Sequence, residues 1–198
     1  QRNDRDESTT AEKRTVKGQL REIGIDGDRP FDRAQESTLC EQHWPGQSRY
    51  LLVTGCFTRL LYWHDGLLTC RGSDSFPIGN PASLSRLGLW AMQEMLQAVE
   101  GITPLTPLSE ALFLHFDKHI DRVIDWSKQA QAADYSTLGH VVLAHPQDAL
   151  AVQLLTRCAG ELNLLLNSLP DSQTEPVSLS GDLAVACLPY LDSGALAS

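Results

Sequence analysis

The sequence has no excess of positive charge and no long hydrophobic run. Its 198 residues include 16 Lys and Arg against 25 Asp and Glu, which gives a net charge of −9. Nucleic acids and anionic membrane surfaces are bound mainly through basic faces, so this balance argues against either as the main partner. No apolar run approaches the roughly 20 residues that cross a bilayer. We therefore expect no nucleic-acid partner and no membrane partner.

Closely spaced cysteines and the common glycine-rich fingerprints are also missing. No two of the five cysteines have the CxxC spacing of a zinc or redox site, so we expect reduced thiols in a cytoplasmic protein. A P-loop, a dinucleotide-binding fingerprint and a G-x-S-x-G nucleophile elbow are all absent. The cysteines are Cys40, Cys56, Cys70, Cys158 and Cys187.

Two histidines, His115 and His119, have the spacing that places side chains on one face of a helix, as metal ligands often are. No third ligand accompanies them, and the neighbouring Phe116 and Ile120 favour a packing role. The sequence therefore predicts no metal site from its own ligand pattern.

The first 36 residues differ from the rest in charge. They contain 8 Lys and Arg and 9 Asp and Glu, and the stretch 1–15 has almost nothing to bury. Such a composition predicts a disordered or loosely attached segment over 1–36, or a remnant of a larger one, and a folded domain over 37–198. The chain begins with Gln1 and not with Met, so we also expect that something is missing upstream.

From Arg49 onward the hydrophobic pattern becomes regular. Residues 50–54 read as a buried strand that ends at Gly55, and Asp65-Gly66 marks a hairpin turn between strands at 60–63 and 67–71. Helices are expected at 87–99, from Thr106-Pro107 onward, at 120–126, 138–145, 148–169 and 183–191, with a late strand at 177–179. A hairpin sheet, a run of helices and a returning strand predict an α/β or α+β domain with helices packed on a short mixed sheet.

Several segments resemble, in order and spacing, the glucosamine and N-acetylglucosamine kinases of the BadF/BadG/BcrA/BcrD ATPase family. That family belongs to the actin-like ATPase and hexokinase superfamily, and the resemblance extends from about Tyr50 to Leu191. The segments are Phe76-Pro77-Ile78-Gly79-Asn80, Leu87-Gly88-Leu89, Thr106-Pro107-Leu108, His115-Phe116, Ile124-Asp125-Trp126-Ser127-Lys128, Asp134-Tyr135 and Asp148-Ala149-Leu150-Ala151.

The resemblance implies a ribonuclease-H-like carboxy-terminal lobe that closes with a second lobe around Mg-ATP and an amino sugar. An Asp would act as general base on the sugar hydroxyl, and glycine turns would hold the nucleotide phosphates. Carried over by position, it implies nucleotide contacts at Gly55, Thr58 and Gly181. It implies substrate contacts at Gly72, Asn80 and Ser83.

Four departures from the family pattern bear on activity. The family's Gly-Thr-Gly-Ser loop is Gly55-Cys56-Phe57-Thr58 here, so Phe57 replaces the glycine that allows close approach to phosphate. The loop that usually reads Gly-Asp-(Glu/Gln)-Gly-Ser-Gly becomes the segment 79–84, where Asn80 has no charge and both later glycines are gone. The adenosine-side Gly-Gly pair becomes Gly181-Asp182.

The fourth departure concerns the base. By counting back, the catalytic Asp falls at Gln35, and the alternatives Asp32 and Glu36 stay open, so the catalytic residue is unknown. Residues 23–28, Ile-Gly-Ile-Asp-Gly-Asp, are similar to the family's first phosphate motif, Gly-Ile-Asp-Gly-Gly. Whether these residues are that motif or match it by chance, the resemblance implies that most of an amino-terminal lobe is missing from this chain.

Three hypotheses follow from the match and its departures. The chain is an ATP-dependent amino-sugar kinase by descent, with impaired phosphoryl transfer. Alternatively it is a non-catalytic protein that binds a sugar, a nucleotide or a regulatory partner, or a truncated lobe without independent activity. Loss of the other lobe would expose an apolar face, so a homodimer is a further expectation.

Overall fold

The computed structural model describes residues 24–72 and 75–192. At its centre lies a mixed sheet of four described strands in the order β3-β2-β1-β4, with β1–β2 and β2–β3 antiparallel and β1–β4 parallel. The strands are β1 (Arg49–Val53), β2 (Arg59–His64), β3 (Leu67–Arg71) and β4 (Val177–Ser180). The expected mixed sheet, the hairpin and the late strand are confirmed, and the structure adds that the late strand pairs in parallel with β1.

The turn between β2 and β3 shows why the sequence marks it so clearly. Asp65 and Gly66 both have positive φ, 47° and 74°, which is the backbone of the tight turn that matches the twist of a hairpin. The two strands then pair from Leu60 opposite Arg71 to His64 opposite Leu67.

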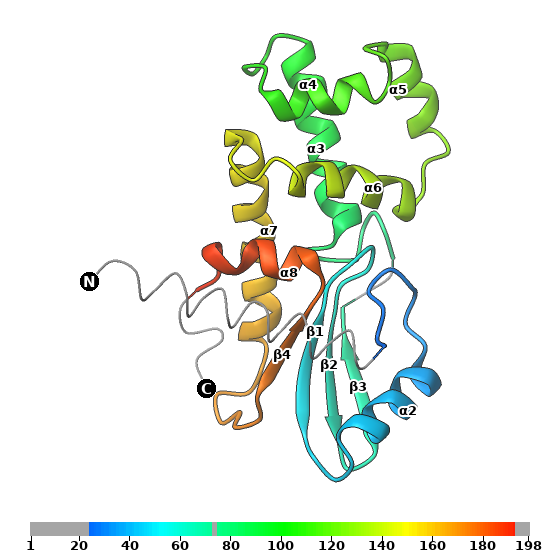
Figure 1. Cartoon of the computed structure of the whole chain (residues 1–198), viewed down its shortest axis with the longest axis vertical. Coiled ribbons are helices and arrows are strands. Elements are labelled where there is room, and N and C mark those ends of the chain that lie inside the picture. The colour runs from blue at the N-terminus through cyan, green and yellow to red at the C-terminus, as the bar shows by residue number, and fades with distance from the viewer. Residues whose placement is uncertain (1–23, 73–74, 193–198) are drawn as a thin grey trace, which may run out of the picture.

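The helices occupy the segments that the periodicity indicated, together with one that it did not. In Figure 1, α3 to α6 rise above the sheet, α7 runs beside both, and α2 lies on the other side of the strands from α7 and α8. The helices are α2 (Arg33–His43), α3 (Leu84–Val99), α4 (Pro107–Leu114), α5 (Ile120–Ser127), α6 (Ala132–Leu143), α7 (Ala149–Asn167) and α8 (Asp182–Cys187), followed by the 3-10 helix η1 (Leu188–Tyr190).

Both faces of the sheet are buried, each by a different set of elements. Along β1, Tyr50 and Leu52 belong to the main core with α3, α7 and α8, while Leu51 and Val53 belong to a second core that includes Cys40 of α2. Because successive side chains of a strand point to opposite faces, burial on both sides produces the continuous apolar run of β1.

A buried ion pair attaches the amino-terminal part to the sheet. Arg59 of β2 is 1% exposed, and its guanidinium lies 2.5 Å from the carboxylate of Glu36 on α2. Arg59 also donates to the backbone carbonyls of Asp26 and Arg29. Residues 24–32 thus lead into α2, and residues 33–36 are its first turn. The earlier part of the charged segment lies outside the described residues, and the division at residue 36 stays a prediction.

Two glycines let α3 and α6 approach each other closely. A Cβ on Gly88 would overlap the carbonyl oxygen of Tyr135, and a Cβ on Gly139 would overlap that of Leu84. The two helices therefore meet backbone to backbone, and this contact fixes the helical part above the sheet.

The histidine pair His115 and His119 does not share a helix. His115 caps the carboxyl end of α4, and His119 precedes the first residue of α5. Within the described residues no group of three or more His, Cys, Asp or Glu side chains is arranged to hold a metal ion.

All five cysteines lie among the described residues, and no disulfide joins any of them. Burial, followed by the charge of Glu36, raises the pKa of the Cys40 thiol to about 12. At neutral pH this thiol stays protonated and unreactive, which suits a packing role.

Helix α7 is long and apolar enough to span a bilayer by length and composition, with a mean hydropathy of 1.3. Its residues Leu154, Cys158 and Leu162 are nevertheless buried in the main core of the domain. Its apolar character is accounted for by this packing.

Asp148 joins the starts of two helices. Its carboxylate accepts from the amide of Leu150 in α7 and from the amide of Leu108 in α4. Burial alone would raise the pKa of Asp148, but these hydrogen bonds outweigh burial and hold that pKa below its ordinary value of 3.8.

Replacing Asp148 with asparagine is expected to lower the free energy of unfolding by about 1 kcal/mol at neutral pH, because Asn has one acceptor oxygen for two amides. A lowered folded-state pKa means that the charge stabilises the fold above pH 4 and loses this effect as the pH falls through the folded pKa. Urea unfolding from pH 7 to pH 3 checks this. A difference between the two proteins that stays constant at acid pH would contradict it.

Candidate functional site

Three glycine turns meet around Thr54, the residue that follows β1. A Cβ on Gly27 would lie 2.5 Å from the Thr54 carbonyl oxygen, and a Cβ on Gly181 would overlap the same atom. A Cβ on Gly55 would overlap the backbone of Gly27. These turns come from sequence positions far apart, and only glycine permits their backbones to touch.

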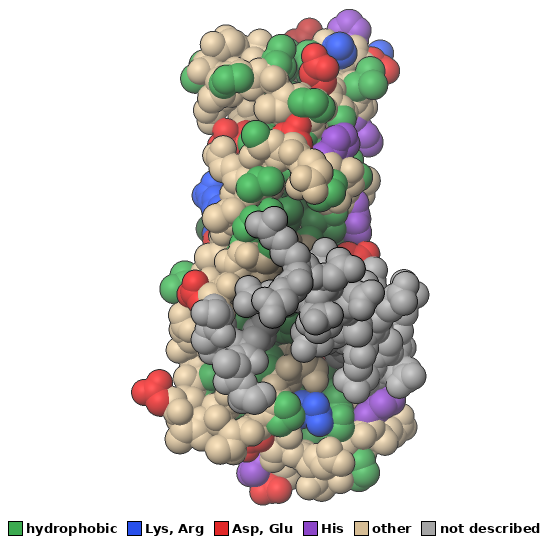
Figure 2. Space-filling model, turned by 60° about the vertical axis from the view of Figure 1, so that its left-hand side comes forward, with side chains coloured by type: hydrophobic (Ala, Val, Ile, Leu, Met, Phe, Trp, Pro, Cys, Tyr) green, Lys and Arg blue, Asp and Glu red, His purple; other side chains and the backbone are tan. Residues whose placement is uncertain are grey.

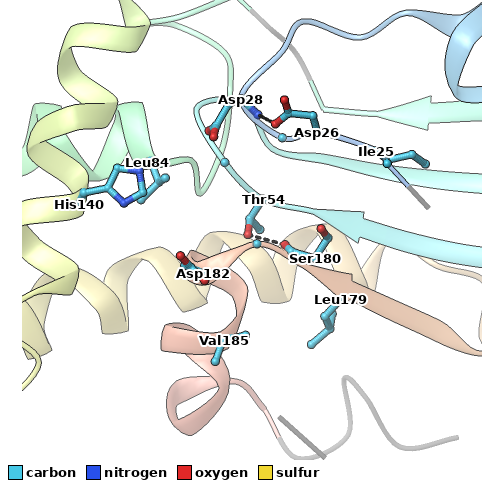
Figure 3. A pocket seen from close by; sticks show the side chains of 14 residues that line it. Ile25, Asp26, Asp28, Thr54, Leu84, His140, Leu179, Ser180, Asp182 and Val185 are labelled. Carbon is cyan, nitrogen blue, oxygen red and sulfur yellow. Dashed lines mark hydrogen bonds between the residues drawn. The ribbon is translucent and has the colours of Figure 1, made fainter. Parts of the chain in front are cut away.

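The Thr54 side chain strengthens this junction. Its hydroxyl donates to the carbonyl of Ser180 at 2.7 Å and accepts from the amide of Ala184 at 3.0 Å, which fixes α8 against the end of β1 (Figure 3). Gly181, with φ of 93°, makes the turn from β4 into α8. The sequence alone does not single out Thr54, because a threonine after a strand is a common feature.

A cavity of about 290 Å³ opens beside the junction. Residues 24–28, Gly55 and Gly181-Asp182 line it, and Leu84 and His140 close it from the helical side (Figure 3). Residues 24–28 of the motif-like segment and two of the three expected nucleotide contacts, Gly55 and Gly181, are thus brought together. His140, to which the sequence pattern assigns no role, also faces this cavity.

Acidic groups dominate the charge of the cavity. Asp26, Asp28 and Asp182 line it, and His140 is the one side chain among its described lining residues that can carry positive charge. Asp26 accepts from the amide of Asp28 at 2.9 Å and forms an ion pair with Arg29. A polyanion placed here would meet negative charge on several sides.

The loop after β1 has its first amides already bonded. The amide of Cys56 donates to the Asp28 carboxylate at 2.9 Å, and the amide of Phe57 donates to the Gly27 carbonyl at 2.8 Å. Successive backbone amides at a turn after a strand are a common anion-binding arrangement. In this chain a carboxylate of the protein itself occupies that position.

Thr58, Asn80 and Ser83 lie deeper, in a fully buried network that joins two loops. Asn80 accepts from the amide of Thr58 at 2.9 Å and donates to the carbonyl of Cys56 at 2.7 Å. The Thr58 hydroxyl donates to the carbonyl of Ala82, and Ser83 caps α3 by accepting from the amide of Arg86. Their polar side-chain atoms hold the loops together, and none of the three lines the cavity.

Gly72 is the remaining expected contact. It is exposed at the end of β3, with φ of 111°, and a Cβ there would lie 2.7 Å from the carbonyl oxygen of Thr58. It therefore lies beside the buried network and away from the cavity lining. The substrate role assigned to it stays a prediction.

A second hollow of about 180 Å³ adjoins the first and shares Gly24, Ile25 and Asp26 with it. All three candidates for the base line this hollow. Glu36 is bonded to Arg59, and Gln35 is an exposed amide. Asp32 is an exposed carboxylate at the N-cap of α2, where it accepts from the amides of Ala34 and Gln35.

These residues fit the two halves of Mg-ATP unequally. The glycine junction and the apolar side chains Leu179 and Val185 provide a wall for a nucleoside. The phosphate side does not fit, because Asp28 already occupies the Cys56 amide and the Gly27 carbonyl occupies the Phe57 amide. The residues in place therefore support no reaction step through a bound triphosphate or metal.

No model of a protein family matches the chain. Glucosamine kinase GspK of Vibrio cholerae is 34% identical over 141 residues, which are 70% of this chain and 48% of GspK. The chain thus spans about half the length of the curated relative that it matches.

A solved structure gives the same result for the fold. The crystal structure of a protein assigned as an N-acetylglucosamine kinase from Chromobacterium violaceum matches with a TM-score of 0.70 and 26% identity, covering 80% of this chain and 56% of that one. Sequence and fold together show that this chain is similar to about half the length of glucosamine and N-acetylglucosamine kinases and has the α/β, ribonuclease-H-like lobe of the actin-like ATPases.

Proposed function

We propose that the chain is a nucleotide-binding member of the amino-sugar kinases in which phosphoryl transfer from ATP to glucosamine or N-acetylglucosamine is impaired. The observation that carries this proposal is the meeting of residues 24–28, Gly55 and Gly181 around one cavity. The relatives are named for kinase activity on these two sugars, which supplies the substrate class.

The residues divide into two roles under this proposal. The cavity at the Thr54 junction takes the adenosine end of the nucleotide. Asp32, in the adjoining hollow, is the exposed carboxylate among the three candidates for the base, so it is the group that would accept a proton from a sugar hydroxyl. Asp28 explains the impairment, since it takes an amide that a phosphate would need.

A second candidate function is nucleotide binding without turnover, and the same bond between Asp28 and Cys56 favours it. The first candidate assumes that this chain keeps the kinase activity for which the relatives are named, and the second candidate does not. Under either candidate, the amino sugar as partner, a homodimer and a cytoplasmic location stay proposals.

The test of the first candidate is transfer of labelled phosphate from ATP to glucosamine and N-acetylglucosamine, with Mg²⁺ and long incubation. We expect slow transfer by the wild-type chain and a loss of about 100-fold or more in Asp32→Asn. Asparagine keeps the N-cap, so the free energy of unfolding should change by less than about 0.5 kcal/mol.

A thermal shift assay with adenosine, Mg-ATP and each sugar separates the candidates. A shift with adenosine but no transfer by the wild-type chain would establish the second candidate over the first. Equal transfer by the wild-type and Asp32→Asn proteins would rule out Asp32 as the general base. No shift with any ligand and no transfer would contradict both candidates.

A further inference from the structure

The carboxylate of Asp28 has an unusual position for a residue at the rim of a cavity. It does not point only into solvent; one of its oxygens accepts the amide of Cys56, 28 residues further along the chain, at 2.9 Å. Cys56 is the first residue after the close contact between Gly27 and Gly55. The carboxylate is therefore held where the loop after β1 presents its amide.

A free carboxylate and a phosphate oxygen make the same kind of bond to a backbone amide. Both are anionic acceptors, and hydrogen bonds to charged groups are about twice as strong as neutral ones. When the chain supplies the anion itself, an external phosphate must displace it before the Cys56 amide can be used. The neighbouring Phe57 amide is not available to a phosphate either, because it donates to the Gly27 carbonyl at 2.8 Å.

The surroundings add a second obstacle of a different kind. Asp26 and Asp182 line the same cavity as Asp28, and Figure 3 shows Asp28 and Asp182 on facing sides of it. A displaced Asp28 would remain nearby as a negative charge. The nucleoside side of the cavity is formed by Leu179, Val185 and the Gly181 turn, with Asp182 as its acidic neighbour, and it does not depend on the amides of the loop after β1.

We propose that Asp28 is a specificity-determining residue that acts as an internal substitute for a phosphate, so that the cavity selects a nucleoside over its triphosphate. The proposal rests on the proposed function in one respect, since it takes the cavity to be a nucleotide site. It adds the class of ligand preferred and the residue that sets the preference.

Three single variants distinguish the two effects of Asp28, which are its hydrogen bond to the Cys56 amide and its negative charge in the cavity. Asp28→Asn removes the charge but keeps an acceptor for the Cys56 amide. Asp28→Gly removes both and frees the amide. Asp182→Asn is the matched control, because it removes one charge from the same cavity and keeps Asp28, the residue that accepts the Cys56 amide.

Calorimetric titration of each protein with adenosine and with Mg-ATP is the test. We expect the wild-type chain to bind adenosine more tightly than Mg-ATP. Asp28→Gly should bind Mg-ATP about 10- to 100-fold more tightly than the wild type, with adenosine affinity nearly unchanged. Asp28→Asn should gain less than Asp28→Gly, and Asp182→Asn should gain least.

Other outcomes overturn the proposal in distinguishable ways. Tighter binding of Mg-ATP than of adenosine by the wild-type chain, or unchanged Mg-ATP affinity in Asp28→Gly, would refute it and leave a nucleotide site in place. An equal gain in Asp182→Asn and Asp28→Gly would refute it as well, because charge alone would then set the preference. If neither ligand binds the wild type or any variant, the nucleotide site itself is absent, and the proposal falls with the proposed function.

A measurement without ligand guards against misfolding of Asp28→Gly. Hydrogen exchange of the Cys56 amide should be faster in Asp28→Gly than in the wild type and nearly unchanged in Asp28→Asn. Circular dichroism should show the same helix content in all four proteins. Unchanged exchange in Asp28→Gly would show that the carboxylate does not protect this amide and would reject the proposal.

Discussion

Replacing Arg59 with methionine is expected to destabilise the domain by about 3–5 kcal/mol. The substitution would leave Glu36 buried without its partner, and the carbonyls of Asp26 and Arg29 would lose the hydrogen bonds that Arg59 donates. Burial already raises the pKa of Glu36 above its ordinary value, and the Arg59 guanidinium opposes that rise. Chemical denaturation at pH 7 measures the change.

A double variant tests whether the missing charge is the cause. Arg59→Met combined with Glu36→Leu should recover most of the lost stability, because no uncompensated charge remains in the core. The exposed pair of Lys128 and Asp125 provides the control: Lys128→Met should change the free energy of unfolding by less than about 1 kcal/mol. Equal losses in the single and double variants would show that the shape of Arg59 matters more than its charge.

The second large effect is expected at Gly88. A methyl group there would overlap the Tyr135 carbonyl oxygen, and because that atom is backbone, α3 and α6 must move apart. We expect Gly88→Ala to lower the free energy of unfolding by about 3 kcal/mol or more. Thermal and chemical unfolding followed by circular dichroism measure it.

Another helical glycine supplies the control for Gly88. Gly160 is exposed on α7, and no atom lies within 4 Å of where its Cβ would be. Gly160→Ala should therefore stabilise the protein by up to about 1 kcal/mol through helix propensity alone. Similar effects of the two substitutions would contradict the close approach of α3 and α6.

Local patterns in the sequence predict most of the secondary structure. Asp65-Gly66 specifies its hairpin, and Thr106 and Pro107 begin α4 as expected. The helix expected from Asp148 is α7, and Asp148 is its N-cap. Each of these signals depends on backbone geometry within a few residues of itself. Turns and helix starts that are set by a few neighbouring residues can therefore be predicted from the sequence.

Helix α2 shows where such patterns fail. Only Glu36 and Cys40 of its residues are buried, so the helix has almost no apolar stripe. Glu36 is held inside by Arg59, which lies on a strand more than 20 residues away. A local sequence pattern cannot reveal an ion pair between residues so far apart in the chain. Asp32 is a local signal for the start of the helix, because aspartate is a common N-cap residue.

The candidate site is predictable only in part for the same reason. Gly55 and Gly181 are identified through the family resemblance, and both line the cavity. The bond between Asp28 and the Cys56 amide joins two segments whose proximity becomes visible only in three dimensions. The buried bonds of Asn80 are likewise invisible in the sequence, where an asparagine in a loop suggests a ligand contact just as readily.

Basic side chains are sparse on the surface as well as in the composition. On the face shown in Figure 2, Lys and Arg side chains are isolated and do not gather into a patch among the described residues. The acidic balance of the sequence is thus matched by the scattered basic side chains in the described part of this face. The absence of a nucleic-acid partner stays a prediction.

The parallel pairing of β1 with β4 has a kinetic consequence. Tyr50 pairs with Val177, more than a hundred residues later, and Gly181 follows that strand directly. Contacts between residues so distant along the chain form late, because the intervening loop must first be closed. The hairpin and the helices can therefore form while the cavity is still open, and β4 completes it last. During synthesis the ligand site would exist only after β4 and the Gly181 turn have left the ribosome.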